Sequence, residues 1–221
     1  MKRDRLAALL LAVLLFLAGS HGEAEANAFP SIWKGRGKTV ALTFDDGPRP
    51  GFVEPILQIL REKRVKATFF VVGQSAAQHP ELIRAIAADG HVLGNHSYYH
   101  NNITLLPREN AGLEWRLCSE ALERILGARP RFARAPGGQS NPFVAGKAAE
   151  EGLRLVLWTN NPGDYRDRIS PSALSKKVLG RSSPGDIVLL HVGVVSTIRA
   201  LPDIIDGYRA RGFRFVTVEE I

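Results

Sequence analysis

Two adjacent carboxylates and a spaced pair of histidines are the residues of this 221-residue chain that could do chemistry together. Asp45 and Asp46 follow an apolar segment, and their mutual repulsion is tolerable only if a cation neutralises at least one of them. His96 and His100 are four residues apart, so on a helical turn both imidazoles would project from one face, as in helical zinc-binding pairs. Asp46, His96 and His100 therefore predict a metal site.

Each half of this set also has an ordinary structural interpretation. The stretch Asp45-Asp46-Gly47-Pro48 could form a turn whose carboxylates face water, and a histidine pair can lie on a surface or in a core. The combination favours a catalytic metal site, because three protein ligands leave coordination positions for water and substrate, whereas structural zinc is usually closed by four.

Two chemistries use one carboxylate and two imidazoles: oxygen activation at ferrous iron and hydrolysis at a Lewis-acid metal. Asp45 favours hydrolysis because it offers a base that can activate water. The expected cofactor is a divalent ion, with zinc first and cobalt or nickel as alternatives, since imidazole suits them all. The single cysteine excludes an internal disulfide and a structural zinc site built from several cysteines.

Alternating apolar segments and helical patterns must position these residues. Buried strands are predicted at residues 40–44, 67–72, 92–93, 132–133, 153–158, 187–190 and 213–216. Helices are predicted at residues 52–64, 80–89, 107–126, 142–151, 171–180 and 197–211. A βα repeat of this kind calls for an α/β fold with a parallel sheet, and seven units favour a closed or nearly closed barrel. A doubly wound open sheet is the alternative.

The predicted helix at residues 107–126 has the clearest two-faced pattern. Its apolar stripe consists of Leu113, Leu117, Ala121, Leu122, Ile125 and Leu126. Its charged face carries Glu114, Arg116, Glu120 and Glu123. We expect the apolar stripe to pack on the sheet and the charged face to point away from it.

Polar residues follow five of the predicted strands where each strand ends. They are Asp45-Asp46, Asn95-His96, Arg134, residues 160–164 and His191. Barrels and open α/β sheets both place their active sites at the carboxyl ends of their strands. The five clusters are therefore expected to meet on one rim, although Arg134 on its own could be a surface residue before a turn.

The amino-acid composition limits which class of protein this chain can belong to. The chain is 45% apolar, carries a formal charge of +7 and has no internal repeat, so a single globular domain over residues 29–221 is expected. A basic chain favours contact with anionic surfaces such as cell-wall polymers or lipid head groups, but the lysines and arginines are scattered rather than clustered. No nucleic-acid partner is expected.

The first 28 residues predict export. Lys2, Arg3 and Arg5 precede an apolar run at residues 6–18, and Ala26-Asn27-Ala28 matches a cleavage site. This pattern is typical of a secretory signal peptide, which would make the protein periplasmic or secreted, without a membrane span after cleavage. An uncleaved anchor is the alternative, although a span needs about 20 apolar residues and this run is shorter.

Four motifs in order resemble the polysaccharide deacetylases of the NodB-homology type, carbohydrate esterase family 4. They are residues 43–48 (TFDDGP), 96–100 (HSYYH), 134–138 (RAPGG) and 189–191 (LLH). The resemblance runs from about Lys38 to the C-terminus. It implies a distorted (β/α) barrel and metal-dependent removal of N- or O-acetyl groups from a polysaccharide such as peptidoglycan or a chitin-like polymer.

The resemblance also implies a role for each residue. Asp45 corresponds to the general base, Arg134 to the residue that holds the base, and His191 to the general acid that protonates the leaving amine. The metal ligands would be Asp46, His96 and His100, and the backbone N–H of Gly137 would bind the oxyanion. Trp158 and Tyr165 could stack on a sugar ring, although a Trp at a strand end is often a core residue. Asp164 is also expected among the substrate contacts, with these two and Gly137.

The chain departs from the family pattern after the fifth predicted strand. The family commonly has an acidic residue there, followed three residues later by Asp-Trp, whereas this chain has Asn161 and then Asp164-Tyr165. Either Asp164 orients His191 or His191 is a weaker acid. Val192 also replaces a common Asp. A non-catalytic glycan-binding relative therefore stands as the alternative function.

Overall fold

Strand β1 (Thr39–Gly47) pairs with three other strands of a seven-stranded parallel sheet. This computed structural model describes residues 31–166 and 169–221, so the predicted signal peptide lies outside the described residues. The other strands are β2 (Thr68–Val71), β3 (Val92–Asn95), β4 (Phe132–Ala133), β5 (Arg154–Leu155), β6 (Asp186–His191) and β7 (Arg214–Val216). Their order is β5-β4-β3-β2-β1-β6, with β7 also paired to β1. All seven predicted strands are present.

Strand β1 has three partners because it is longer than the others. Its first residues pair with β7, its last residues pair with β2, and β6 runs along it from Val40 to Asp45. The register sets Asp45 opposite His191. Every residue of β1 except Asp46 is buried, which is expected of a strand covered on both faces. The strand therefore brings two predicted site residues to one rim.

The sheet curls until the segment after β5 meets β6. A parallel bridge joins Asn160 to Val188, and the N–H of Leu189 donates to the carbonyl of Asn160 at 2.9 Å. A second bridge joins Ile32 to Val156. These contacts close most of the gap between the two ends of the sheet, so the distorted, nearly closed barrel predicted from the sequence is correct and the open doubly wound sheet is not.

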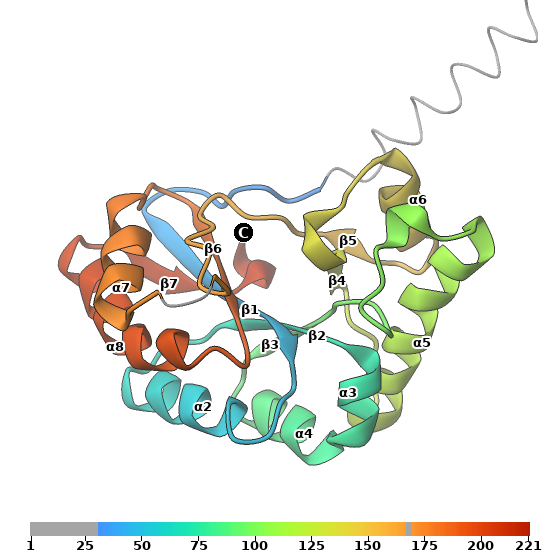
Figure 1. Cartoon of the computed structure of the whole chain (residues 1–221), viewed down its shortest axis with the longest axis horizontal. Helices are drawn as coiled ribbons and strands as arrows, with labels where there is room; N and C mark the ends of the chain where they lie inside the picture. The colour runs from blue at the N-terminus through green and yellow to red at the C-terminus, as the bar shows by residue number, and fades with distance from the viewer. Residues whose placement is uncertain (1–30, 167–168) are drawn as a thin grey trace, which may run out of the picture. The chain divides into compact units, whose positions relative to one another are not determined.

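The helices surround the curled sheet (Figure 1). They are α2 (Val53–Glu62), α3 (Gly73–Gln78), α4 (Pro80–Ala88), α5 (Arg108–Leu126), α6 (Pro142–Glu150), α7 (Pro171–Gly180) and α8 (Val195–Ala210). In Figure 1, α7 and α8 lie on one side of the sheet and α5 and α6 on the other. Within the described residues, no helix is long and apolar enough to cross a membrane.

Local sequence signals explain where the helices begin and end. Asn141 and Ser170 cap α6 and α7, each accepting a hydrogen bond from a first-turn N–H, and each cap is followed by a proline. Helix α5 ends at Gly127, which has a positive φ of 74°. Helix α3 was not predicted, because it spans only six residues and buries only Gly73 and Ala76.

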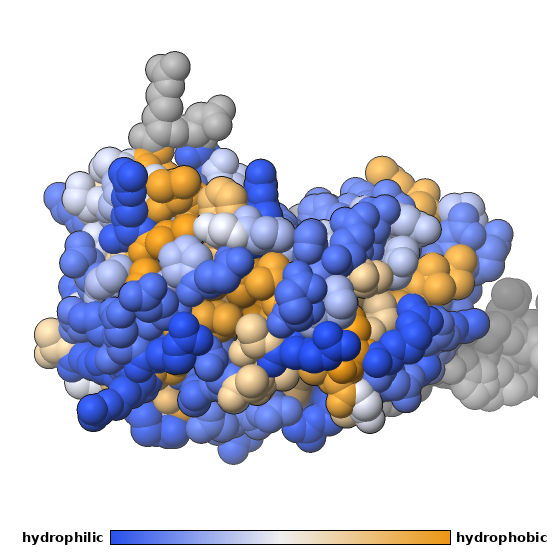
Figure 2. Space-filling view, turned by 90° about the horizontal axis from the view of Figure 1, so that it is seen from below, coloured by the Kyte–Doolittle hydropathy of each residue, from blue (hydrophilic) through white to orange (hydrophobic). Residues whose placement is uncertain are grey.

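The core lies between the sheet and the helices, as the amphipathic patterns require. Helix α2 buries Val53, Ile56, Leu57 and Leu60, which recur at helical spacing. Figure 2 shows the face at the bottom of Figure 1, where hydrophilic residues dominate and hydrophobic residues appear in patches between them. Helices on this face therefore turn their apolar sides inward and their polar sides outward.

The predicted orientation of α5 is correct in its second half, where Ala121 and Leu122 are each 1% exposed, but wrong at Leu113 and Glu114. Leu113, expected on the packed stripe, is 43% exposed, whereas Glu114, expected on the charged face, is 5% exposed. The helix also turns Trp115 and Cys118 into the core, and both are fully buried. Trp115 and Cys118 were not counted in the leucine pattern. The buried position of Glu114 is explained by polar contacts that the periodicity of apolar residues does not encode.

Candidate active site

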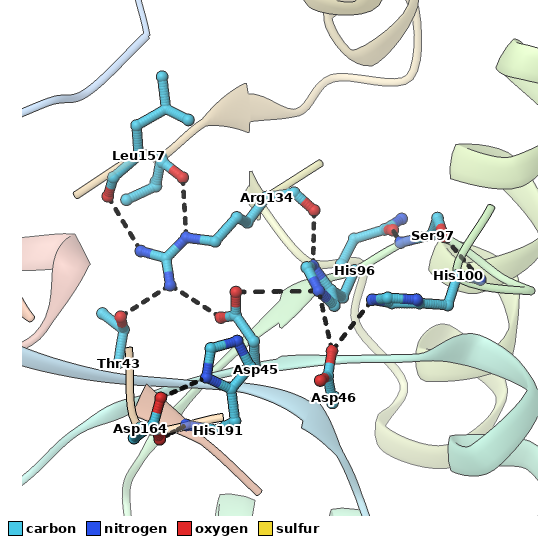
Figure 3. Close-up of polar contacts among 12 residues, drawn as sticks. Thr43, Asp45, Asp46, His96, Ser97, His100, Arg134, Leu157, Asp164 and His191 are labelled. Atoms are coloured by element: carbon cyan, nitrogen blue, oxygen red, sulfur yellow. Dashed lines mark hydrogen bonds and ion pairs between the residues drawn. The ribbon is translucent and has the colours of Figure 1, made fainter. Parts of the chain in front are cut away.

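The carboxyl ends of β1, β3, β4 and β6 bring the predicted residues together (Figure 3). Asp46 Oδ1 lies 3.3 Å from His96 Nε2 and 3.0 Å from His100 Nε2. One donor atom from each of these three residues lies within 4.8 Å of the other two. The predicted ligand set is therefore a spatial cluster, formed by the end of β1 and the segment that follows β3.

The donor set fits a divalent metal ion. The Nδ1–H of His96 donates to the Arg134 carbonyl at 2.8 Å, so its Nε2 is unprotonated in the neutral ring and faces Asp46. A histidine ligand held through its other ring nitrogen in this way is typical of metal centres. One carboxylate and two imidazoles also match the composition of catalytic zinc sites. The site is open, because the His100 side chain is 44% exposed.

The two histidines do not lie on a helical turn, so this part of the prediction is wrong. Residues 96–100 form a loop in which Ser97 and His100 adopt positive φ angles of 64° and 61°. Asp46 has a φ of 68°. Such angles are uncommon in residues other than glycine and cost free energy that the surrounding structure must offset. The spacing of the histidines was informative, but the backbone geometry behind it was not helical.

Asp46 and the two histidines perturb each other's pKa. Burial alone would raise the pKa of Asp46, but hydrogen bonds with His100 and His96 outweigh it and lower the pKa well below its usual range. The hydrogen bond with Asp46 raises the pKa of His100 against the opposing effect of burial. Asp46 is therefore ionised at neutral pH and carries the negative charge that a cation needs.

Arg134 is fully buried and makes four hydrogen bonds. Its Nη1 donates to Asp45 Oδ1 at 2.8 Å and to Thr43 Oγ1 at 2.7 Å. Its Nε and Nη2 donate to the carbonyls of Val156 and Leu157, both at 3.0 Å. Burial lowers the pKa of Arg134, and the charge of Asp45 opposes that shift. The interpretation of Arg134 as a surface residue before a turn is excluded.

Asp45 lies between the arginine and the ligand cluster. Its Oδ1 accepts the Arg134 hydrogen bond, and its Oδ2 lies 3.8 Å from His96 Nε2. The side chain is 4% exposed, so it is held by its neighbours rather than by water. A carboxylate fixed beside a metal site in this way can accept a proton from a water molecule that attacks a substrate.

His191 is held by Asp164. The Nδ1–H of His191 donates to Asp164 Oδ1 at 2.8 Å, and its backbone N–H donates to Oδ2 at 2.8 Å. The Thr197 hydroxyl also donates to Oδ2, at 2.7 Å, a contact that sequence reasoning missed. Burial alone would lower the pKa of His191, but the hydrogen bond to Asp164 and the nearby carboxylates raise it.

The unusual Asn161 does not take part in this contact. Its side-chain oxygen accepts a hydrogen bond from the Gly163 N–H at 2.9 Å. Asp164 is 1% exposed and lies behind the imidazole of His191, so its predicted contact with substrate does not fit its position. Of the two alternatives left open by the sequence, the structure matches the one in which Asp164 orients His191.

These residues surround one pocket of about 380 Å³. Gly137, Trp158 and Tyr165, the other predicted substrate contacts, line it, whereas Arg134 and Asp164 lie behind its wall. Tyr165 is 53% exposed, and its ring meets the His191 ring edge-on at 5.1 Å. The full lining consists of Asp45, Asp46, His96, His100, Gly137, Gly138, Trp158, Asn161, Tyr165, Leu189 and His191.

Two consecutive glycines shape one wall of the pocket. Gly137 and Gly138 have positive φ angles of 63° and 68°. A Cβ atom on Gly138 would come within 2.2 Å of the Trp158 ring, so only glycine allows the turn to lie against this side chain. Trp158 also faces the buried guanidinium of Arg134, at 5.6 Å from its ring centroid. Trp158 therefore supports the arginine and lines the pocket at the same time.

Comparisons with known proteins agree with this geometry. The model of the polysaccharide deacetylase family matches residues 34–156. A peptidoglycan-N-acetylglucosamine deacetylase of Bacillus cereus is 36% identical over 183 residues, which cover 81% of this chain and 66% of that protein. A chitooligosaccharide deacetylase of Rhizobium leguminosarum bv. trifolii is 36% identical over 193 residues, which cover 80% of this chain and 88% of that protein.

A solved structure extends the likeness to the fold. The Bc1960 peptidoglycan N-acetylglucosamine deacetylase matches with a TM-score of 0.83 and 33% identity, over 87% of this chain and 92% of that chain. The chain belongs to the polysaccharide deacetylase family. This membership makes it a hydrolase of the class that acts on amide bonds.

Proposed function

We propose that this chain is an exported, metal-dependent deacetylase that removes acetyl groups from a polysaccharide. The observation that carries the proposal is the position of Asp45, a buried carboxylate held by Arg134 at 2.8 Å beside the Asp46, His96 and His100 cluster. His191 lines the same pocket. A base, a ligand set and an acid therefore surround one space of about 380 Å³.

Asp46, His96 and His100 would hold a divalent ion. When bound, this ion would supply two things that hydrolysis needs: a polarised acetyl carbonyl and a more acidic water molecule. Zinc is the ion we propose, with cobalt and nickel as alternatives. Asp45 accepts the proton of the attacking water, and Arg134 holds this carboxylate in position. The backbone N–H of Gly137, in the pocket wall, stabilises the negative charge that develops on the acetyl oxygen.

His191 completes the reaction as the acid. The hydrogen bond to Asp164 orients the imidazole and raises its pKa, so that more of it is protonated near neutral pH. The protonated ring donates its Nε2 proton to the nitrogen of the sugar as the carbon–nitrogen bond breaks. Acetate and a free amine on the sugar are the products.

The N-acetyl group of N-acetylglucosamine units is the substrate group we propose, in peptidoglycan or a chitin-like polymer. The named relatives support this class, since one acts on peptidoglycan and another on chitooligosaccharides. The signal-peptide pattern of residues 1–28 supports export to the compartment where cell-wall polymers lie. Trp158 and Tyr165 line the pocket and offer rings on which a sugar could stack.

Acetate release from purified peptidoglycan and from a chitin oligomer tests the proposal and ranks the two substrates. We expect release from at least one polymer, abolished by a chelator and restored by zinc. An O-acetylated sugar polymer serves as the comparison that separates amide from ester hydrolysis. Binding of the oligomer without any acetate release under all metal conditions would contradict the proposal and favour a non-catalytic glycan-binding protein.

A further inference from the structure

Glu114 is a buried carboxylate that contacts the loop bearing the metal ligands. It lies in the second turn of α5 and is 5% exposed. Its Oε2 accepts hydrogen bonds from the N–H groups of Tyr98 at 2.8 Å and Tyr99 at 2.9 Å. Its Oε1 accepts a hydrogen bond from Asn101 Nδ2 at 2.8 Å. Both oxygens are thus engaged by residues on either side of His100.

These bonds act where the backbone is strained. Ser97 and His100 have positive φ angles of 64° and 61°, which residues with side chains adopt only when neighbouring contacts offset the cost. Tyr98 and Tyr99 lie between them. Because Glu114 binds the N–H groups of both tyrosines, it fixes the part of the loop that connects the two strained residues.

The other face of the loop is tied by backbone groups at the start of α3. The N–H of Gly73 donates to the Ser97 carbonyl at 2.9 Å, and the N–H of Gln74 donates to the Tyr98 carbonyl at 3.0 Å. These bonds fix the first half of the loop and none of them reaches beyond Tyr98. The segment leading into His100 therefore depends on Glu114 and on the 3.0 Å bond from the His100 N–H to Ser97 Oγ.

We propose that Glu114 is a positioning residue that holds His100 in the orientation needed to bind the metal ion. The inference rests on the proposed function, since it concerns the same metal site. Glu114 acts through hydrogen-bond geometry, because one carboxylate oxygen can accept both converging N–H groups. When a residue that holds a metal ligand in place by hydrogen bonds is mutated, metal affinity typically falls by about 10- to 100-fold.

Two conservative variants separate geometry from charge. Glu114→Asp keeps the charge but shortens the side chain by one methylene, so its carboxylate no longer reaches both N–H groups. Glu114→Gln keeps the length and one acceptor oxygen for the tyrosine N–H groups, and its amide can donate to Asn101 once the Asn101 amide rotates. If Glu114 acts through hydrogen-bond geometry, metal affinity should fall in Glu114→Asp and be retained in Glu114→Gln.

The measurement is zinc affinity of the metal-free protein by calorimetry, without any substrate. We expect Glu114→Asp to raise the dissociation constant about tenfold or more and Glu114→Gln to stay within about threefold of wild type. Glu109→Asp and Glu109→Gln, at an exposed position in the first turn of the same helix, are the matched controls and should equal wild type. The visible spectrum of bound Co²⁺ should change in Glu114→Asp alone.

The outcomes distinguish the inference from the function on which it rests. Equal zinc affinity in wild type and Glu114→Asp, with unchanged Co²⁺ spectra, would overturn the inference and leave the proposed function intact. Loss of affinity in Glu114→Gln as large as in Glu114→Asp would also overturn it, because the variant that keeps the hydrogen-bond geometry would then bind zinc no better than the variant that loses it. A wild-type protein that binds no zinc would contradict the proposed function itself.

Discussion

The Nη1 of Arg134 donates to Asp45 Oδ1 at 2.8 Å, and neither side chain exposes more than 4% of its surface. The guanidinium donates its other hydrogen bonds to Thr43, Val156 and Leu157. These contacts fix its orientation. An arginine with this pattern of planar contacts cannot be replaced by lysine without losing several of them. The ion pair therefore fixes the position of the proposed base.

Arg134→Met should destabilise the protein strongly. Removal of one partner from a buried ion pair leaves an uncompensated charge and typically costs about 3–5 kcal/mol. Urea unfolding measures this loss. In the double variant Arg134→Met with Asp45→Asn, no charge is left unpaired, so the total loss should be smaller than the sum of the two single effects. Additive losses would show that the two residues are not coupled.

Asp45→Asn should separate proton transfer from metal binding. The amide keeps the shape of the carboxylate and can still accept the Arg134 hydrogen bond, but it cannot take a proton from water. We expect acetate release to fall by about 10² or more, because general-base catalysis contributes that much. Zinc content, measured by elemental analysis, should remain that of wild type. Near-normal hydrolysis in this variant would identify a different base.

Asp164 should set the alkaline limb of the pH–rate profile. His191 must be protonated to act as an acid, so activity falls as pH rises through its pKa, which Asp164 raises. Asp164→Asn removes the charge, lowers that pKa and should move the alkaline limb to lower pH. Asn161→Asp is the comparison, and we expect a smaller shift because Asn161 does not contact the imidazole. A profile unchanged in Asp164→Asn would contradict this role of the pair.

His91 should make the fold sensitive to mild acid. Burial, aided by the charge of Lys66, lowers the pKa of His91 to about 4, whereas an unfolded chain has an ordinary histidine pKa. Between these values the unfolded state binds more protons, so stability falls as pH drops through that window. His91→Gln should lose less stability than wild type between pH 7 and pH 5, in thermal unfolding. His79→Gln, at a partly exposed position, is the control and should follow wild type.

The sequence predicted the strands well because most of them are short runs of buried apolar residues. Every strand from β1 to β7 overlaps its predicted segment, and the polar residues at the strand ends do meet. The clustering of Asp46, His96 and His100 was predicted because one carboxylate and two spaced imidazoles are a typical set of metal-binding residue types. Asp45, Arg134 and His191 were found by the same means, together with family resemblance.

The parts that were missed depend on polar contacts between distant segments. The stripe of leucines on α5 suggested an outward-facing Glu114, but the N–H groups of Tyr98 and Tyr99 draw this carboxylate into the interior. The histidine spacing suggested a helix, but Ser97 and His100 adopt positive φ angles that only the surrounding hydrogen bonds can stabilise. Such interactions join residues far apart in the chain and leave no periodic signal.

The central claim is that hydrolysis depends on a metal ion held by Asp46, His96 and His100. Zinc titration of the metal-free protein, with acetate release from the preferred polymer followed at each step, tests it most directly. We expect activity to rise with zinc and to saturate at one ion per chain, whereas His100→Ala stays inactive at the same zinc concentrations. Full acetate release by the metal-free protein, or equal zinc-dependent release by His100→Ala, would contradict a metal-dependent reaction at this site.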